Sequence, residues 1–221
     1  MNKVPFRLLR TSNHPCSYLQ GRSASTTFLD PEIQVTKHIN TLFSQRGFRR
    51  SGDLLYKPNC DTCNLCISCR IPINDFTLKK SHHRIIKGNS DLRVVEADNL
   101  NCDESYKLYE LYINNRHKDG DMFPPSKDQF NSFLKKKTDE TVFFKFFNKG
   151  ELIAVSVTDI LSDGLSAIYS FYNPFENKRS LGTYSILYQT RSAFERELSY
   201  LYLGYWVKNC RKMDYKIKFR L

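Results

Sequence analysis

Four cysteines recur at every third position of the sequence, at Cys60, Cys63, Cys66 and Cys69. Cysteines with this spacing supply thiolate ligands to zinc or to an iron–sulfur cluster. Strong zinc sites usually combine two well-separated pairs, so Cys16 is a further candidate ligand. We therefore expect zinc or an iron–sulfur cluster at these cysteines, and the alternative is a loop of reduced thiols that binds no metal.

A second group of reactive side chains stands at the end of a helix expected over residues 103–117. Arg116 and His117 are followed closely by Asp119 and Asp121. An imidazole beside carboxylates can move protons while an amine attacks an ester. A salt bridge and a turn at the helix end explain the same pattern equally well.

The motif Ser180-Leu181-Gly182-Thr183 opens a helix expected over residues 181–197. Backbone amides at a helix start bind phosphate groups, and acetyltransferases hold the pyrophosphate of coenzyme A in this way. Their loop normally carries two glycines, whereas this motif has only Gly182. We therefore expect Gly182 and Thr183 to contact a phosphate or ribose of a different donor.

The net charge of +11 arises from two basic segments, residues 46–93 and 205–221, because the rest of the chain is balanced. A surplus confined to two segments indicates a surface for a polyanion, and a basic surface that aids solubility is the alternative. Aromatic residues precede the cations of the second segment, as in proteins that stack bases and hold phosphates. The lysines expected to contact a nucleic acid are Lys80, Lys87, Lys208, Lys212 and Lys216.

The composition is that of a folded protein without a membrane segment. Hydrophobic residues make up 40% of the chain and charged residues 26%. No apolar run is long enough to cross a bilayer, and residues 1–10 lack the apolar core of a signal peptide. We expect a cytoplasmic protein with reduced thiols and no membrane partner.

The second half of the chain alternates strand and turn signals. The expected strands cover residues 141–147, 152–158, 166–172 and 200–206. The helix over residues 181–197 separates the third strand from the fourth. This order predicts an α/β (α+β) fold: a GNAT-type, acetyltransferase-like mixed sheet with flanking helices.

Two regions are expected along the chain. Residues 1–76 form a small N-terminal region that holds the cysteine loop, and residues 77–221 form the acetyltransferase-like core. Further helices are expected from Asp30-Pro31 to about residue 46 and from Ser126 to about residue 137, because each start carries a capping residue.

Several motifs, in order along the chain, carry a family resemblance. They are Pro15-Cys16-Ser17-Tyr18-Leu19, Phe48-Arg49-Arg50-Ser51-Gly52, Tyr56-Lys57-Pro58 with Cys60, Cys63 and Cys66, Arg116-His117, Val157-Thr158-Asp159, Ser180-Leu181-Gly182-Thr183, and Tyr202-Leu203-Gly204-Tyr205-Trp206. In these motifs the chain resembles the bacterial aspartate/glutamate leucyltransferases, relatives of the arginyl-tRNA–protein transferases. The matches run from residue 15 to the end of the chain, which makes them more specific than any single motif.

The resemblance implies an aminoacyltransferase that moves leucine from leucyl-tRNA to proteins beginning with Asp or Glu and so marks them for N-degron (N-end rule) degradation. It also implies an acetyltransferase-like fold and a reaction that needs no cofactor. The partners would be leucyl-tRNA, on the lysines named above, and a protein with an acidic N-terminal residue. We expect the enzyme to be a monomer.

The resemblance also indicates substrate-binding residues. Where the family has a basic stretch rich in Ser and Arg, this chain has Lys80-Ser81-His82-His83-Arg84, in which Ser81 and Arg84 match. A guanidinium pairs bidentately with a carboxylate, so Arg84 is expected to hold the acidic side chain of the acceptor. The other residues expected to bind substrate are Ser81, Arg116, Ser166, Gly182 and Thr183.

The mechanism that follows is direct acyl transfer from the tRNA ester to the α-amine of the acceptor. Asp159 or His117 is expected to accept the amine proton, and Tyr169 to assist the leaving hydroxyl. Two other classes of function remain open on the residues alone. They are a coenzyme A-dependent N-acetyltransferase and a non-catalytic module that binds metal or RNA.

Overall fold

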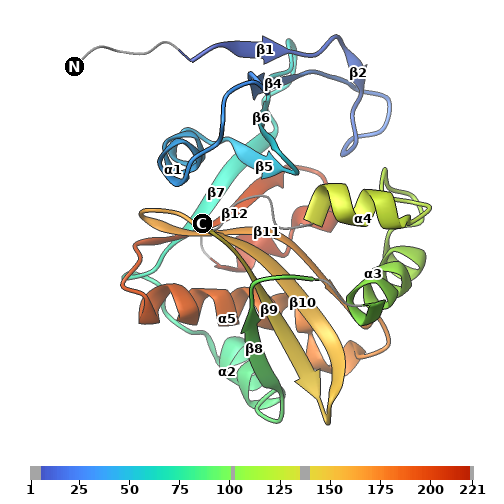
Figure 1. Cartoon of the computed structure of the whole chain (residues 1–221), viewed down its shortest axis with the longest axis vertical. Helices are drawn as coiled ribbons and strands as arrows, with labels where there is room; N and C mark the ends of the chain where they lie inside the picture. Colours follow the sequence, from blue (N-terminus) through green and yellow to red (C-terminus); the bar gives the residue numbers. More distant parts are fainter. Residues whose placement is uncertain (1–5, 101–102, 135–139, 220–221) are drawn as a thin grey trace.

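The N-terminal region is a small antiparallel sheet with one helix packed against it. A computed structural model describes residues 6–100, 103–134 and 140–219 (Figure 1). The four strands of the small sheet, in spatial order, are β1 (Leu8–Arg10), β4 (Thr26–Leu29), β6 (Leu54–Pro58) and β5 (Arg49–Ser51). A two-stranded ribbon pairs β2 (His14–Pro15) with β3 (Ser23–Ala24). The buried core of the small sheet consists of Leu29, Phe43, Phe48 and Leu55.

Helix α1 (Lys37–Gln45) begins later than the sequence predicts. Asp30 Oδ1 accepts a hydrogen bond from the backbone N–H of Glu32 at 3.0 Å, which makes a local turn where the first helical turn was expected. Thr36 caps the helix instead, because its Oγ1 accepts from the N–H of Ile39 at 3.3 Å.

A six-stranded mixed sheet forms the centre of the molecule. Its strands, in spatial order, are β7 (Cys66–Pro72), β12 (Tyr200–Val207), β11 (Gly164–Tyr172), β10 (Glu151–Ile160), β9 (Thr141–Asn148) and β8 (Arg93–Ala97). Only the pair of β11 and β12 is parallel, and helix α5 (Leu181–Glu195) connects these two strands. The predicted order of three strands, a helix and a strand is confirmed.

Helices cover both faces of this sheet (Figure 1). Helix α5 and helix α2 (Lys80–Lys87) pack on one face, where Leu181 and Phe146 belong to one buried cluster. Helix α3 (Asp103–Arg116) and helix α4 (Lys127–Leu134) pack on the other face, around Tyr109 and Phe171. Within the described residues no helix combines the length and the apolar character needed to span a bilayer.

The basic stretch that begins at Lys79 forms two elements that the sequence did not predict, α2 and β8. Helix α2 buries a single residue, His82, whose ring stacks between Phe76 and Phe219 at centroid distances of 5.7 and 5.5 Å. The N-cap of α2 is Lys79 rather than Ser, Thr, Asp or Asn, so the sequence does not mark where this helix begins. The expected end of α4 near residue 137 lies outside the described residues.

Strand β7 belongs to the segment assigned to the N-terminal region, yet it is an edge strand of the six-stranded sheet. The two regions are therefore joined through backbone pairing along β7 and β12, from Cys66 opposite Val207 to Pro72 opposite Tyr200. This pairing places the cysteine loop and the small sheet next to the parallel pair of strands.

A buried ion pair joins the small sheet to the large one. The guanidinium of Arg50 on β5 donates to both carboxylate oxygens of Asp159 on β10, at 2.6 and 2.8 Å, and both side chains are at most 2% exposed. Thr141 Oγ1 donates to Asp159 at 2.8 Å and Asn40 Nδ2 at 3.2 Å. With four hydrogen bonds on two oxygens, this geometry favours a structural role for Asp159 over its expected role as a proton acceptor.

We predict that Asp159→Asn lowers the free energy of unfolding by about 3–5 kcal/mol, because it leaves the Arg50 charge buried without a counter-ion. Urea unfolding followed by circular dichroism measures this change. The control is Glu195→Gln, which breaks the exposed pair of Arg191 and Glu195 and should cost less than about 0.5 kcal/mol. Wild-type stability in Asp159→Asn, combined with lost activity, would support the catalytic role instead.

Candidate active site

The parallel strands β11 and β12 separate part-way along their length. They pair only from Gly164 opposite Tyr200 to Ser166 opposite Tyr202, although β11 continues to Tyr172 and β12 to Val207. Close contact at the paired end requires Gly164, since a Cβ there would lie 2.4 Å from the carbonyl oxygen of Tyr200. Beyond Ser166 the two strands present backbone groups to a gap between them.

The side chain of Arg49 on β5 occupies this gap. Its guanidinium donates to the carbonyl oxygens of Ala167 at 2.5 Å and Ile168 at 3.4 Å, and to Ser166 Oγ at 3.3 Å. Arg49 thus replaces strand pairing with side-chain hydrogen bonds. The approach requires Gly204, because a Cβ there would lie 2.7 Å from Arg49 Nε.

A cluster of tyrosines lies along the separated part of β11. The ring of Tyr112 on α3 contacts Tyr172 at a centroid distance of 4.8 Å and Tyr169 at 6.4 Å. His117 completes the cluster, with its ring 5.0 Å from that of Tyr112 and its Nε2 3.1 Å from the Tyr112 hydroxyl. We call Tyr112, His117, Tyr169 and Tyr172 the tyrosine cluster.

Burial shifts the pKa of three members of the cluster toward the uncharged form. It raises the pKa of the Tyr112 and Tyr169 hydroxyls, so both remain phenols at neutral pH. Burial, and then the nearby Lys212, lower the pKa of His117, so its imidazole is neutral and can accept a proton. The hydroxyl of Tyr169 is buried and has no hydrogen-bond partner within the described residues, so it is a polar group left unsatisfied beside the cluster.

The start of α5 lies against the same cluster. A Cβ on Gly182 would lie 3.1 Å from the Tyr172 ring, so glycine permits this contact. Ser180 precedes the helix with a left-handed φ of 53°. Arg179 is engaged elsewhere, because it forms an ion pair with Asp91 at 2.8 Å and with Glu176 at 3.0 Å.

Profiles of the arginine-tRNA-protein transferase family match most of the chain. The profile of the N-terminal part matches residues 14–84, and that of the C-terminal part matches residues 104–221. The chain belongs to this family.

Curated relatives of this transferase share about half of its residues. A protein of Pseudomonas fluorescens (strain SBW25), named aspartate/glutamate leucyltransferase, is 49% identical over 95% of this chain and 89% of its own length. Proteins of the same name are 50% identical in Hahella chejuensis, over 95% and 90% of the two chains, and 48% identical in Alcanivorax borkumensis, over 97% and 88%.

Two solved structures show weaker similarity. L-PGS from Bacillus licheniformis superposes with a TM-score of 0.49 and 11% identity, over 74% of this chain and 48% of its own. The C-terminal domain of a putative lysylphosphatidylglycerol synthetase from Agrobacterium fabrum gives 0.47 and 12%, over 75% and 50%.

The transferase gathers some of the expected site residues around the gap. His117 and Tyr169 belong to the tyrosine cluster, and Gly182 touches it. Thr183 is in the first turn of α5, and Arg116 binds the loop before α5 through Asn177 Oδ1 at 2.9 Å. Ser166 lies at the point where the strands separate, but it is buried and accepts a hydrogen bond from Arg49.

Other expected residues lie apart from the cluster. Ser81 and Arg84 are exposed on α2, on the opposite face of the sheet from α3, and no contact within the described residues joins them to the gap. The end of α2 does approach the start of α5, because Asn89 Nδ2 donates to the carbonyl of Arg179 at 2.8 Å.

The expected lysines do not share one surface. Lys80 and Lys87 are exposed on α2, and Lys208 is exposed just after β12. Lys212 pairs with Asp119 at 2.6 Å, close to His117 on the α3 side. Lys216 is 5% exposed and donates to the carbonyl of Tyr205 at 2.5 Å, so this lysine is not positioned to hold a phosphate on the surface.

The structure separates Cys69 from the other three regularly spaced cysteines, Cys60, Cys63 and Cys66. Burial, with smaller contributions from the thiols of Cys16, Cys60, Cys63 and Cys210, raises the pKa of Cys66 to about 11. Cys69 is separate and donates to the carbonyl of Gly204 at 3.2 Å. No group of three or more His, Cys, Asp or Glu side chains in the described part of the chain is arranged to hold a metal ion. The expected metal ligands therefore do not fit a metal centre in this arrangement.

Three arginines near the gap were not predicted as site residues. Arg49 and Arg50 belong to one of the matching motifs, whereas nothing in the sequence singles out Arg70. The one signal for Arg49 is Gly204, where a Cβ would lie 2.7 Å from Arg49 Nε. Which carbonyl or carboxylate an arginine meets is decided by tertiary structure.

Proposed function

We propose that this transferase moves leucine from leucyl-tRNA to the α-amine of proteins that begin with Asp or Glu, and so marks them for degradation. The observation that carries the proposal is the identity of about half, along nearly the full chain, with proteins named aspartate/glutamate leucyltransferase. The gap between β11 and β12, lined by an uncharged tyrosine cluster, is a suitable site for the reaction.

The reaction is a direct acyl transfer. The amine nitrogen of the acceptor attacks the carbonyl carbon of the leucyl ester, an amide bond forms, and the bond to the 3′ oxygen of the tRNA breaks. The amine loses one proton and the leaving 3′ oxygen gains one, so no oxidant, reductant or cofactor is needed. Because the ester is already activated, the protein mainly positions the two reactants.

His117 is the better placed of the two expected proton acceptors. Its imidazole is half-buried and neutral at the edge of the cluster, whereas both oxygens of Asp159 are occupied by Arg50, Thr141 and Asn40. Tyr169 offers a buried hydroxyl without a partner within the described residues. In the proposed mechanism this hydroxyl donates a hydrogen bond to the leaving 3′ oxygen.

The fold is proposed to be acetyltransferase-like. In support, two parallel strands separate next to the start of the helix that connects them. We place the 3′ end of the tRNA at the start of α5, near Gly182 and Thr183. The exposed Lys80 and Lys87 lie on the neighbouring helix α2, where they can neutralise backbone phosphates.

A coenzyme A-dependent N-acetyltransferase is the main alternative. Its pyrophosphate would need free donors at the start of α5, but Arg179 is already paired with Asp91 and Glu176. Calorimetric titration with acetyl-CoA distinguishes the two functions, and tight binding would favour the acetyltransferase. A non-catalytic RNA-binding module would bind tRNA with steep salt dependence and transfer nothing.

We predict transfer of radiolabelled leucine from charged tRNA to peptides that begin with Asp or Glu, and none to a matched peptide that begins with Ala. Scintillation counting of the peptide, with leucyl- and arginyl-tRNA as parallel donors, measures the result. Transfer of arginine alone would contradict the proposed donor, and no transfer from either would contradict the proposed function.

We predict that activity falls as pH decreases through a pKa below that of an unperturbed histidine, because His117 must be neutral to accept a proton and burial lowers its pKa. His117→Gln should lower kcat and remove this dependence. Single-turnover transfer from pH 5 to 8 measures both profiles. His38→Gln, at an exposed position of α1, is the control. The acceptor amine gives an acidic limb of its own, so a pH profile of His117→Gln identical in shape to that of the wild type would exclude the role.

We predict that Tyr169→Phe lowers kcat about tenfold or more, with little change in the KM for the peptide, because the hydroxyl bonds the leaving oxygen only as the ester breaks. Folding should be unaffected, since this hydroxyl has no partner within the described residues to lose. Tyr188→Phe, on the opposite face of the sheet, is the matched control. Equal kcat values for wild type and Tyr169→Phe would refute the assigned role.

A further inference from the structure

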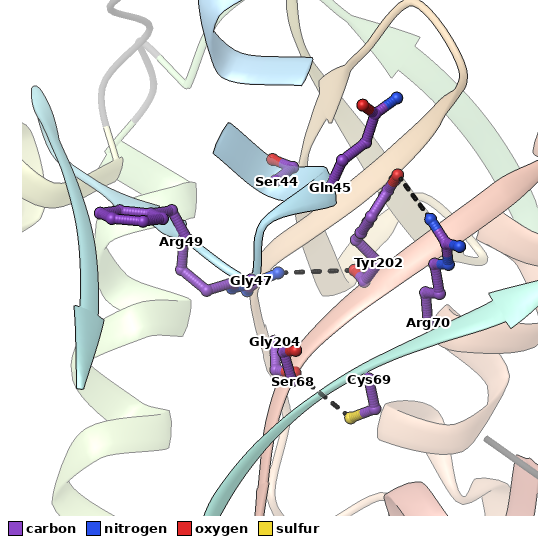
Figure 2. Close-up of a pocket in the computed structure, with 10 residues that line it drawn as sticks. Ser44, Gln45, Gly47, Arg49, Ser68, Cys69, Arg70, Tyr202 and Gly204 are labelled. Atoms are coloured by element: carbon purple, nitrogen blue, oxygen red, sulfur yellow. Dashed lines mark hydrogen bonds between the residues drawn. The ribbon is translucent and has the colours of Figure 1, made fainter. Parts of the chain in front are cut away.

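A pocket of about 220 Å³ lies where α1 and β5 face β7 and β12 (Figure 2). At a share of ~30 Å³ per water molecule, this space can hold one polar amino-acid side chain. Its lining is polar, with the hydroxyls of Ser44 and Ser68 and the amide of Gln45. Arg49 and Arg70 are the only charged residues among those that line it.

The charges around the pocket favour an anion. Besides the two arginines, the ammonium of Lys57 lies close, 3.5 Å from the position of a Cβ on Gly47. The acid nearest to the lining residues is Asp163, which accepts hydrogen bonds from Gln45 at 2.9 Å and from the Tyr202 hydroxyl at 2.8 Å. Three cations against one carboxylate leave a net positive pocket.

Arg70 is the cation that remains available. Arg49 is occupied by backbone carbonyls of β11, whereas Arg70 is exposed and has no ion pair within the described residues. Its guanidinium lies over the ring of Tyr200, 3.7 Å from the centroid, and donates one hydrogen bond to the Tyr202 hydroxyl at 3.3 Å. These two contacts fix its orientation and leave N–H donors for a carboxylate.

The pocket adjoins the tyrosine cluster. Arg49 lines the pocket and also enters the gap between β11 and β12. A residue with its side chain in the pocket can therefore direct its backbone toward the gap.

We propose that Arg70 binds the side-chain carboxylate of the acceptor's first residue in this pocket and so selects Asp and Glu. This inference rests on the proposed function, and it gives Arg70 the role that the sequence assigned to Arg84. Arg84 lies on α2, and no contact within the described residues joins it to the gap. A phosphate of the tRNA is the competing ligand, and the experiment below separates the two.

The test compares Arg70→Gln and Arg70→Lys with the wild type in leucine transfer to peptides that begin with Asp and with Asn. Arg70→Gln should raise the KM for the Asp peptide about tenfold or more, because a charged, bidentate contact is lost. The KM for leucyl-tRNA should not change. Arg70→Lys should recover only part of the affinity, since an ammonium cannot form the two parallel hydrogen bonds that a guanidinium forms with a carboxylate.

Selectivity gives a second readout. The ratio of kcat/KM for the Asp peptide over the Asn peptide should fall in Arg70→Gln and stay at the wild-type value in Arg191→Gln, an exposed arginine on α5. Urea unfolding of each variant checks that folding is intact, as expected for the exposed Arg70.

Each contrary result has a distinct meaning. A raised KM for leucyl-tRNA with an unchanged KM for the Asp peptide would make the pocket a phosphate site and overturn the inference. Unchanged selectivity in Arg70→Gln, or the larger loss of Asp selectivity in Arg84→Gln, would also overturn it. A wild type that transfers no leucine would instead refute the proposed function, and the inference with it.

Discussion

The insertion of Arg49 between β11 and β12 is the interaction on which the site depends. Two parallel strands that separate expose carbonyl oxygens that would normally be paired, and leaving such groups buried and unpaired costs ~1–3 kcal/mol each. Arg49 satisfies the carbonyls of Ala167 and Ile168 and reaches toward that of Tyr202. A side chain from the N-terminal region therefore replaces the missing strand pairing and holds β11 and β12 apart.

The neighbouring Arg50 explains why this side chain stays in place. Consecutive residues of a strand point to opposite sides, and Arg50 reaches Asp159 on β10 while Arg49 reaches β11. Detaching the small sheet would leave Asp159 charged and unpaired in the core, which is a strong penalty. The small N-terminal sheet is thus tied to the strands that border the candidate site, because Arg50 binds β10 and Arg49 binds β11.

Local patterns predicted the order of the strands in the second half, because turn residues bound the first three strands and a single helix, α5, precedes the fourth. Roles set by tertiary contacts were not predictable. The sequence predicts that Asp159 is a reactive carboxylate and that Lys216 is a surface cation, yet both side chains are buried. Helix α2 was not predicted because its N-cap is Lys79, which does not mark a helix start. Of the predicted catalytic residues, His117 and Tyr169 do lie together, because a helix end and a strand centre meet at Tyr112.

The environment of Lys216 indicates how the site can favour a reactive amine. Burial, and then the positive charge of Arg49, lower the pKa of this ammonium to about 8. An α-amine starts from an ordinary pKa of about 7.7–8.0, so the same two effects would make an acceptor amine in the gap largely neutral at physiological pH. A neutral amine can attack an activated ester at once and loses its proton only as the bond forms. In the proposed reaction only a weak base such as His117 is then required, which agrees with a candidate site that contains buried tyrosine hydroxyls and whose one buried carboxylate, Asp159, is already paired.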